Sequence, residues 1–274
     1  MAQPGPHRYK PRRPYLNTEH ASADCLFLHA FWEAGGTRSL DLAGNGFDGV
    51  AESSGPTATD WQDGPDGPAW GPFDGTAEGV LIGTGNVPTF DEYTLLTRFY
   101  APADGVGAWS NLFSINGATD KFDPGITDNT GSFSVNGFSP SFNGTATYAE
   151  DTWHTFVYSD KAAGAGAHDI RIFHDGVFEE EITAAFWGHP CTNVSTDEVI
   201  IGGDGPGNEV SGCTFSICAF WLRAMSDAEA IALSADPFAL ITPVPHPIAV
   251  TTVAVEAPAP GTFLKQPVST LLRM

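Results

Sequence analysis

Residues 150–181 read EDTWHTFVYSDKAAGAGAHDIRIFHDGVFEEE, and this stretch decides the fold. Side chains from Trp153 to Val157 alternate between two faces, as do those from Ile170 to Phe173, and this period of two is typical of strands. A glycine-rich loop separates the two runs. The Asp175-Gly176 pair then supplies the positive φ angles of a two-residue hairpin. The stretch therefore predicts three consecutive antiparallel strands.

Runs with the same character, bounded by turn residues, occur along most of the chain. The predicted strands are Cys25–Trp32, Gly79–Ile82, Tyr93–Tyr100, Trp109–Ile115, Ser132–Gly137, Thr152–Ser159, Asp169–His174, Val177–Thr183, Val199–Gly202 and Cys213–Leu222. This number of strands suits two packed sheets.

One short helix is predicted near the end of this region. Ser226 and Glu229 have the spacing of a capping box, in which each side chain satisfies the backbone of the other residue. The helix is expected to end near Ala235, because the following Asp236-Pro237 pair cannot continue it.

The chain has 274 residues, with 31 Gly and 21 Pro, and shows few helical periodicities. This composition favours one all-β domain, a sandwich or a barrel, over two domains. The basic N-terminal segment is not followed by an apolar stretch, and no run approaches the length of a membrane span. We therefore expect neither a signal peptide nor membrane insertion.

The charge is distributed unevenly. All 33 acidic residues lie between Glu19 and Glu256, where only six basic residues oppose them. The other six basic residues lie in the two tails, four of them near the N-terminus: Arg8, Lys10, Arg12 and Arg13. Such an acidic body repels nucleic acid and anionic membranes, whereas basic tails are attracted to an acidic protein surface or to nucleic acid. We predict no membrane partner and no specific nucleic acid.

Both ends of the chain are rich in proline. Residues 1–20 are predicted to form an extended basic arm and residues 243–274 a proline-rich tail, on either side of a sandwich at residues 21–242. The four N-terminal basic residues are candidates for docking to a partner protein. The alternative is a soluble domain with disordered ends, because termini commonly lack order unless they are tied down.

The four cysteines, Cys25, Cys191, Cys213 and Cys218, lack the paired spacing of a metal site and are expected to be reduced core residues. A zinc site formed by cysteines with histidines is the alternative. Cys213 and Cys218 are an odd number of positions apart, so in a regular strand they face opposite sides of the sheet.

The order of these elements resembles a concanavalin A-like domain of the laminin-G type. The resemblance covers roughly residues 22–240, from SLDLAGNGFDGV (39–50) and FDGTAEGVLI (73–82) through the meander and VIIGGDG (199–205) to WLRAMSDAEAIAL (221–233). It implies a jelly-roll sandwich of two antiparallel sheets with one short C-terminal helix. That fold serves lectins, glucanases, adhesion modules and virion proteins of tailed phages, so it does not select among those functions.

The resemblance also implies a calcium loop. The segment from Asp41 to Gly46 is similar to the family's Asp-x-Ser-Gly-Asn-Gly loop, with Ala43 in place of Ser. Asp41 and Asn45 would supply oxygen ligands to Ca²⁺, and Asp74 is a further candidate ligand. The alternative is an Asx-turn network in which Asp41 and Asn45 satisfy backbone donors.

Four tryptophans in or beside predicted loops are candidates for stacking on a glycan: Trp61, Trp70, Trp109 and Trp187. The alternative is that they close the edge of the core or an interface. Trp153 and Trp221 lie within predicted strands and are expected to belong to the core.

A glucan hydrolase of this superfamily carries an alternating Glu-x-Asp-x-x-Glu strand, and that pattern is absent. The nearest substitute is Glu179 and Glu181, which in a regular strand share a face about 7 Å apart, a separation that inverting glycosidases use. We interpret them as a solvated acidic face and predict that the protein is not an enzyme.

The leading hypothesis is a structural protein on a virion surface, assembled in the host cytoplasm, which docks on capsid or tail subunits through its arms and forms a homo-oligomer. The alternative is a carbohydrate-binding adhesin module, ordered by calcium, that recognises a surface glycan.

Overall fold

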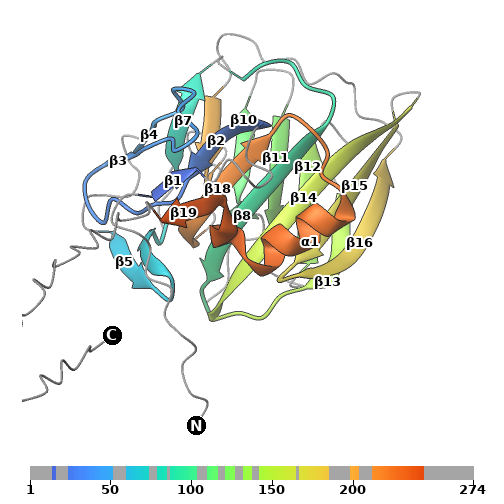
Figure 1. The fold of residues 1–274 in the computed structure, drawn as a ribbon. Coiled ribbons are helices and arrows are strands. Elements are labelled where there is room, and N and C mark those ends of the chain that lie inside the picture. The colour runs from blue at the N-terminus through green and yellow to red at the C-terminus, as the bar shows by residue number, and fades with distance from the viewer. Residues whose placement is uncertain are drawn as a thin grey trace, which may run out of the picture. The chain divides into compact units, whose positions relative to one another are not determined.

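The computed structural model describes residues 14–16, 24–51, 60–73, 79–84, 87–103, 110–116, 121–126, 132–137, 142–164, 167–184, 198–203 and 212–243. These residues form an all-β sandwich with a single short α-helix among the described elements (Figure 1). Every strand pairing is antiparallel, as predicted.

An eight-stranded sheet contains the meander. Its order is β16 (Val177–Ala184), β15 (Ala167–His174), β14 (Thr152–Gly164), β8 (Tyr93–Ala101), β18 (Thr214–Trp221), β6 (Gly67–Trp70) and β5 (Trp61–Gly64), and β2 (Cys25–His29) also pairs with β18. Asp175 and Gly176 have φ angles of 47° and 87°, so the hairpin between β15 and β16 has the predicted turn.

A nine-stranded sheet packs against one face of the first. Its order is β13 (Phe142–Thr147), β12 (Ser132–Gly137), β11 (Lys121–Ile126), β10 (Phe113–Asn116), β17 (Glu198–Ile201), β7 (Val80–Thr84), β4 (Gly49–Ala51) and β3 (Arg38–Ser39), and β9 (Ser110–Asn111) pairs with β11. Aromatic side chains fill the space between the two sheets. Phe220 of β18 lies 5.7 Å from Phe27 and 5.4 Å from Phe113 of the opposite sheet, between ring centroids.

The other face of the eight-stranded sheet, here called the outer face, carries helix α1 (Asp227–Ala235). The helix lies over β14, β15 and β16 (Figure 1). Its Ala230 and Leu233 join Leu96, Val157 and Trp221 of the sheet in a second apolar cluster. The sheet is therefore buried on both faces, which explains why all eight residues of β18 are buried.

The predicted capping box is confirmed. The Ser226 side chain accepts from the backbone N–H of Glu229, and the Glu229 carboxylate accepts from the backbone N–H of Ser226. A 3₁₀ turn, η2 (Pro237–Leu240), follows the helix.

Part of the predicted N-terminal arm is a strand. Strand β1 (Pro14–Leu16) pairs with β19 (Ile241–Pro243) in a separate two-stranded sheet. Residues 1–13 and 244–274, which include Arg8, Lys10, Arg12 and Arg13, lie outside the described residues.

The prediction that Cys213 and Cys218 face opposite sides of the sheet is wrong. Both pack in the cluster between the two sheets, because the pairing of β18 with β8 shifts register between Phe215 and Ile217. This bulge adds one residue and reverses the alternation. Cys25, Cys213 and Cys218 are all buried, as expected of core residues, and none of the three forms a disulfide.

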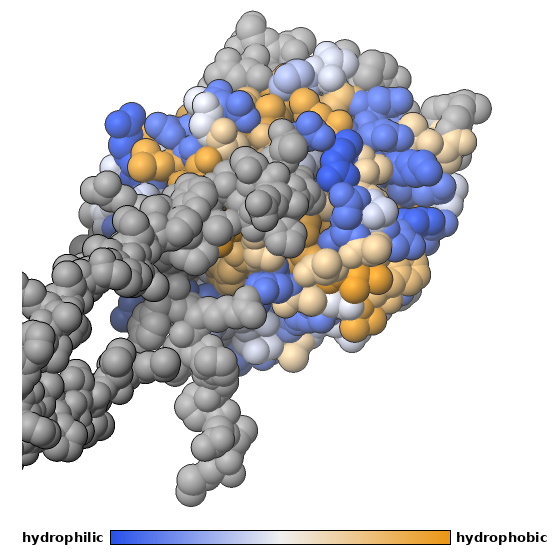
Figure 2. All heavy atoms as spheres, viewed as in Figure 1, coloured by the Kyte–Doolittle hydropathy of each residue, from blue (hydrophilic) through white to orange (hydrophobic). Residues whose placement is uncertain are grey.

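None of the described helices is long and apolar enough to cross a membrane. On the face that carries α1, apolar side chains occur in small groups among hydrophilic ones (Figure 2). Among the described residues, the exposed large apolar side chains are Leu40, Val50, Val177, Phe178 and Ile231.

Candidate functional site

The Asp41 carboxylate is surrounded by backbone donors. Its Oδ1 accepts from the N–H groups of Leu28 and Ala43 at 3.1 and 2.9 Å, and its Oδ2 accepts from those of Asn45 and Phe47 at 2.9 and 3.4 Å. Four N–H dipoles with their positive ends toward one carboxylate oppose a cation there. This geometry corresponds to the Asx-network alternative.

The Asn45 side chain also bonds to the backbone, since its Nδ2 donates to the carbonyls of Cys25 and Leu26, both at 3.0 Å. Asp74, the third predicted calcium ligand, lies outside the described residues. The two described members of the predicted calcium set therefore hold the loop against β2.

Of the four predicted glycan-stacking tryptophans, the structure describes two. Trp70 is fully buried in the inter-sheet core and offers no surface to a glycan, so its assignment is corrected. Trp61 is half-buried, stacks on Trp70 at 4.8 Å between ring centroids and donates from Nε1 to the carbonyl of Gly36. Trp109 and Trp187 lie outside the described residues.

A different aromatic surface lies on the outer face. Trp153 of β14 and Tyr100 of β8 are direct cross-strand partners, with ring centroids 5.7 Å apart, and both are partly exposed. Trp153 is therefore not fully enclosed in the core, contrary to its predicted place. We call these two residues, with Arg98, Asp66 and Asp151, the outer-face patch.

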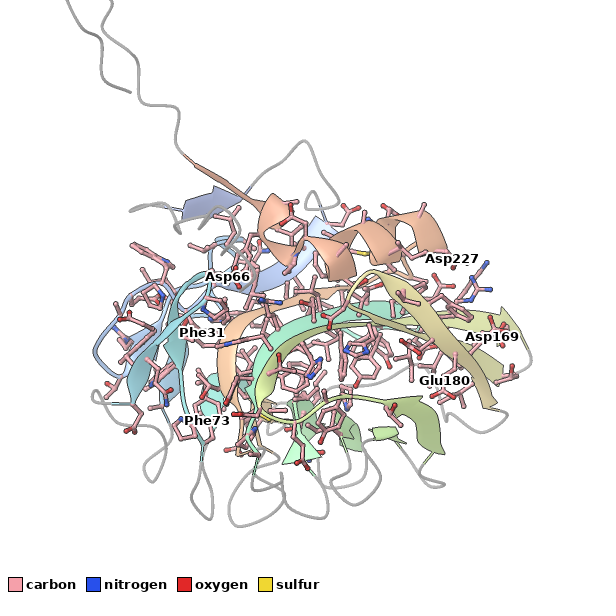
Figure 3. All side chains as sticks on the ribbon, turned by 90° about the horizontal axis from the view of Figure 1, so that it is seen from below. Phe31, Asp66, Phe73, Asp169, Glu180 and Asp227 are labelled. Carbon is pink, nitrogen blue, oxygen red and sulfur yellow. The ribbon has the colours of Figure 1, made fainter. Side chains whose placement is uncertain are left out.

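The polar members of the patch are fixed by hydrogen bonds. Arg98 donates to Asp66 at 2.8 Å and to the Thr155 hydroxyl at 3.0 Å, and its guanidinium lies 5.7 Å from the centre of the Trp153 ring. Asp66 lies on the side of the sheet that carries α1 (Figure 3). The Tyr100 hydroxyl donates to Asp151, and this bond raises the pKa of the tyrosine.

A second polar group lies on the opposite face of β14, at the end of the meander. Nδ1 of His154 is 2.8 Å from Nε2 of His174 and 3.3 Å from Oδ2 of Asp175, and His174 Nε2 is 3.1 Å from the same Oδ2. We call these three residues the His–Asp cluster. His154 is buried, whereas the Asp175 side chain is 44% exposed, so the cluster opens to solvent on one side.

Asp175 is held as a charged carboxylate. Partial burial by itself raises its pKa, but hydrogen bonds from His154, His174 and the Thr155 N–H outweigh that effect and hold the pKa well below its usual range. Asp175 is thus both the turn residue of the hairpin and the charged member of the cluster.

The acidic run of β16 does not form a pair of catalytic carboxylates. The pairing of β15 with β16 shifts register between Ile172 and Phe173, which makes Glu179 the extra residue of a bulge in β16, so Glu179 and Glu181 reach different partners. Glu181 pairs with Arg171 at 2.7 Å, and Arg171 also contacts Asp227 of the helix on the outer face. Glu179 lies 3.7 Å from His174 of the cluster.

Sequence reasoning identified neither site. The meander pairing was itself a signal for the cluster, because it places His154 and His174 on one face and next to the turn. For the patch, the signal was weaker: Arg98 and Tyr100 alternate with apolar residues in β8, but the hairpin that brings Asp66 to them was not predicted.

No protein-family model matches this sequence, and neither does any curated protein. Solved structures with a similar fold do exist. Domain 4 of AbnA, a GH43 extracellular arabinanase from Geobacillus stearothermophilus, in complex with arabinotriose, is 14% identical with a TM-score of 0.58. The similarity covers 77% of this chain and 98% of that one.

A sialidase from Trypanosoma rangeli is 14% identical with a TM-score of 0.52, over 78% of this chain and 33% of that one. The same sialidase in complex with sialic acid is 15% identical with a TM-score of 0.51. This chain thus spans about a third of the sialidase. The similarities show a shared β-sandwich fold.

Proposed function

We propose that this chain is a carbohydrate-binding module and that the outer-face patch is its ligand surface. The observation that carries the proposal is the cross-strand pair of Trp153 and Tyr100, partly exposed and bordered by charged side chains. The module binds a glycan without converting it.

The chemistry of the patch suits a sugar. The C–H face of a sugar ring packs against an aromatic ring, and its hydroxyl groups accept from guanidinium groups and donate to carboxylates. Arg98 is already held by Asp66 and Thr155, so little side-chain entropy is lost when a ligand binds.

The similar fold of AbnA domain 4, a structure that contains arabinotriose, supports an oligosaccharide as the ligand class. The sialidase complex with sialic acid makes an acidic sugar the second class to examine, since Arg98 could pair with a carboxylate.

A glycan array that contains arabino-oligosaccharides and sialylated oligosaccharides tests the proposal, with calorimetry for each ligand found. Tyr100→Ala and Trp153→Ala should each weaken binding at least tenfold. Because Trp153 also packs against Gly64, its variant is first checked for an unchanged thermal transition. Phe178→Ala removes an exposed aromatic ring elsewhere on the sheet and should bind as the wild type does.

The absence of any bound glycan would contradict the proposal. So would wild-type affinity in both the Tyr100 and the Trp153 variants. If only the Phe178 variant lost binding, the ligand would bind at Phe178 and not at the outer-face patch.

A finer proposal places this module on a virion surface, docked on capsid or tail subunits. It rests on the basic residues of the N-terminal arm, which lie outside the described residues. Deleting residues 1–13 spares β1 and should abolish incorporation into particles while glycan binding persists. Unchanged incorporation would contradict the docking role of the arm and would leave the glycan-binding proposal unaffected.

A further inference from the structure

We infer that His154, His174 and Asp175 bind a divalent transition metal ion of the Zn²⁺ class. One ligand atom from each residue converges on one point, and the three atoms lie 2.8, 3.1 and 3.3 Å from one another. This site is independent of the proposed glycan surface and contains none of the residues of the predicted calcium loop.

The spacing suits tetrahedral coordination. Zinc bonds to nitrogen and carboxylate oxygen of about 2.0–2.2 Å place neighbouring ligand atoms roughly 3.3 Å apart. The observed separations reach that value after outward movements of a few tenths of an ångström. Three protein ligands with one open position are typical of an accessible zinc site, and the exposure of Asp175 provides the opening.

Neighbouring groups orient each ligand atom toward this point. His154 Nε2 lies 2.6 Å from the carbonyl of Ala149, which can only accept a hydrogen bond, so Nε2 keeps its proton. A bound metal ion would replace the proton that Nδ1 shares with Asp175, and Nδ1 would then present its lone pair to the ion. The Thr155 N–H donates to Oδ1 of Asp175 and leaves Oδ2 directed inward. Such contacts outside the ligands are typical of built metal sites.

His174 has a similar arrangement. Its Nε2 faces the other two ligand atoms, and its Nδ1 lies 3.7 Å from Oε1 of Glu179. A carboxylate behind a histidine ligand increases the basicity of the ring, which strengthens the bond to a metal. The bulge in β16 therefore has a role, since it directs Glu179 to this face.

The ligands come from a stiff part of the fold. His154 packs among Phe99, Phe156 and Tyr148, with ring centroids 5.6–6.1 Å away. Asp175 is fixed in the hairpin turn. Imidazole nitrogen suits Zn²⁺, Cu²⁺ and Ni²⁺, whereas Ca²⁺ and Mg²⁺ prefer sites made only of oxygen, so the donor set selects a transition metal.

The test uses the full chain after treatment with a chelator. Zn²⁺ is titrated in competition with a chromophoric chelator, and Co²⁺ reports tetrahedral geometry by its visible absorption. We expect one equivalent of Zn²⁺ to bind, and excess Ca²⁺ or Mg²⁺ not to displace it.

Asp175→Asn and His174→Gln should each weaken Zn²⁺ binding at least tenfold. Asn suits the positive φ of this turn, so the first variant keeps the hairpin while it removes the charge. Glu181→Gln is the matched control, because this residue lies on the same strand as Glu179 but pairs with Arg171. It should bind Zn²⁺ as the wild type does.

Thermal unfolding gives a second measurement. Saturating Zn²⁺ should raise the Tm of the wild type and of the Glu181 variant, and leave that of the Asp175 variant unchanged. Wild-type Zn²⁺ affinity in both ligand variants would overturn the inference, because the ion would then be bound elsewhere. The absence of binding to the wild type would also overturn it and leave the cluster as a hydrogen-bonded brace.

Discussion

At the scale of single residues, the most unusual environment belongs to Asp160 and His168. Both side chains are buried, and Oδ1 of Asp160 lies 2.8 Å from Nδ1 of His168. The other carboxylate oxygen, Oδ2, is buried without a hydrogen-bond partner. Burial raises the pKa of Asp160 to about 6, although the histidine partly offsets the effect, and the hydrogen bond to Asp160 raises the pKa of His168. Asp91 and Glu92 add to both shifts.

These shifts predict that stability falls as the pH rises. Between the unfolded pKa of Asp160, near 3.8, and its folded pKa, near 6, the folded chain binds more protons than the unfolded chain. The free energy of unfolding should therefore decrease over this interval, by up to about 3 kcal/mol. His168 extends the decrease to higher pH. Asp175 acts in the opposite sense, but only below about pH 4.

Asp160→Asn should flatten this dependence, because the amide cannot ionise. The measurement is urea unfolding at a series of pH values from 4 to 7. Asp169→Asn, in which a neighbouring residue bound to Thr183 is changed, should keep the wild-type slope. An equally steep slope in the Asp160 variant would assign the dependence to other groups.

At the scale of elements, local sequence signals were reliable where they acted within one strand or turn. All ten predicted strands have counterparts in the structure, and α1 ends at Ala235 as expected. Several of the strands that were not predicted contain no β-branched residue, the type that marks a strand. In β5 and β6, for example, glycine, proline and aspartate suggest a loop, yet Trp61 stacking on Trp70 makes the hairpin part of the core.

The capping box gives a prediction at this scale. Ser226→Ala should lower the free energy of unfolding by about 1 kcal/mol, because the N–H of Glu229 loses its acceptor at the first turn of α1. Chemical denaturation measures this difference. Ser226→Thr keeps a capping hydroxyl and should remain within about 0.5 kcal/mol of the wild type. Equal losses in both variants would show that the hydroxyl does not act as a cap.

At the scale of the whole domain, aromatic rings join the two sheets. Phe220 stacks on Tyr93 and on Phe27, and it contacts Phe113 of the opposite sheet. Helix α1 lies above the eight-stranded sheet, and Glu180 lies below it, between the sheets (Figure 3). The eight-stranded sheet is thus the central layer, and its stability depends on contacts across both faces.

Phe220→Ala should lower the free energy of unfolding by about 3–5 kcal/mol, since it leaves a cavity at the contact between the sheets. Phe178→Ala is the control, because that ring is 44% exposed on β16, and it should cost less than about 1 kcal/mol. Urea unfolding followed by far-UV and near-UV circular dichroism measures both. Two separate transitions in the wild type would contradict the joint stability of the sheets.

The sequence alone determined the meander, its Asp175-Gly176 turn and the capped helix, because each depends on periodicity or hydrogen bonds within a few residues. Tertiary structure decided what the chemically active side chains face. The bulge in β18 reversed the expected orientation of Cys218. The Asp41 carboxylate, which the sequence indicated as a calcium ligand, accepts hydrogen bonds from backbone N–H groups instead. Strand pairing brought His154 beside His174, although twenty positions separate them. The physical reason is that register shifts and contacts between distant strands depend on packing across the whole core, and no local pattern encodes them.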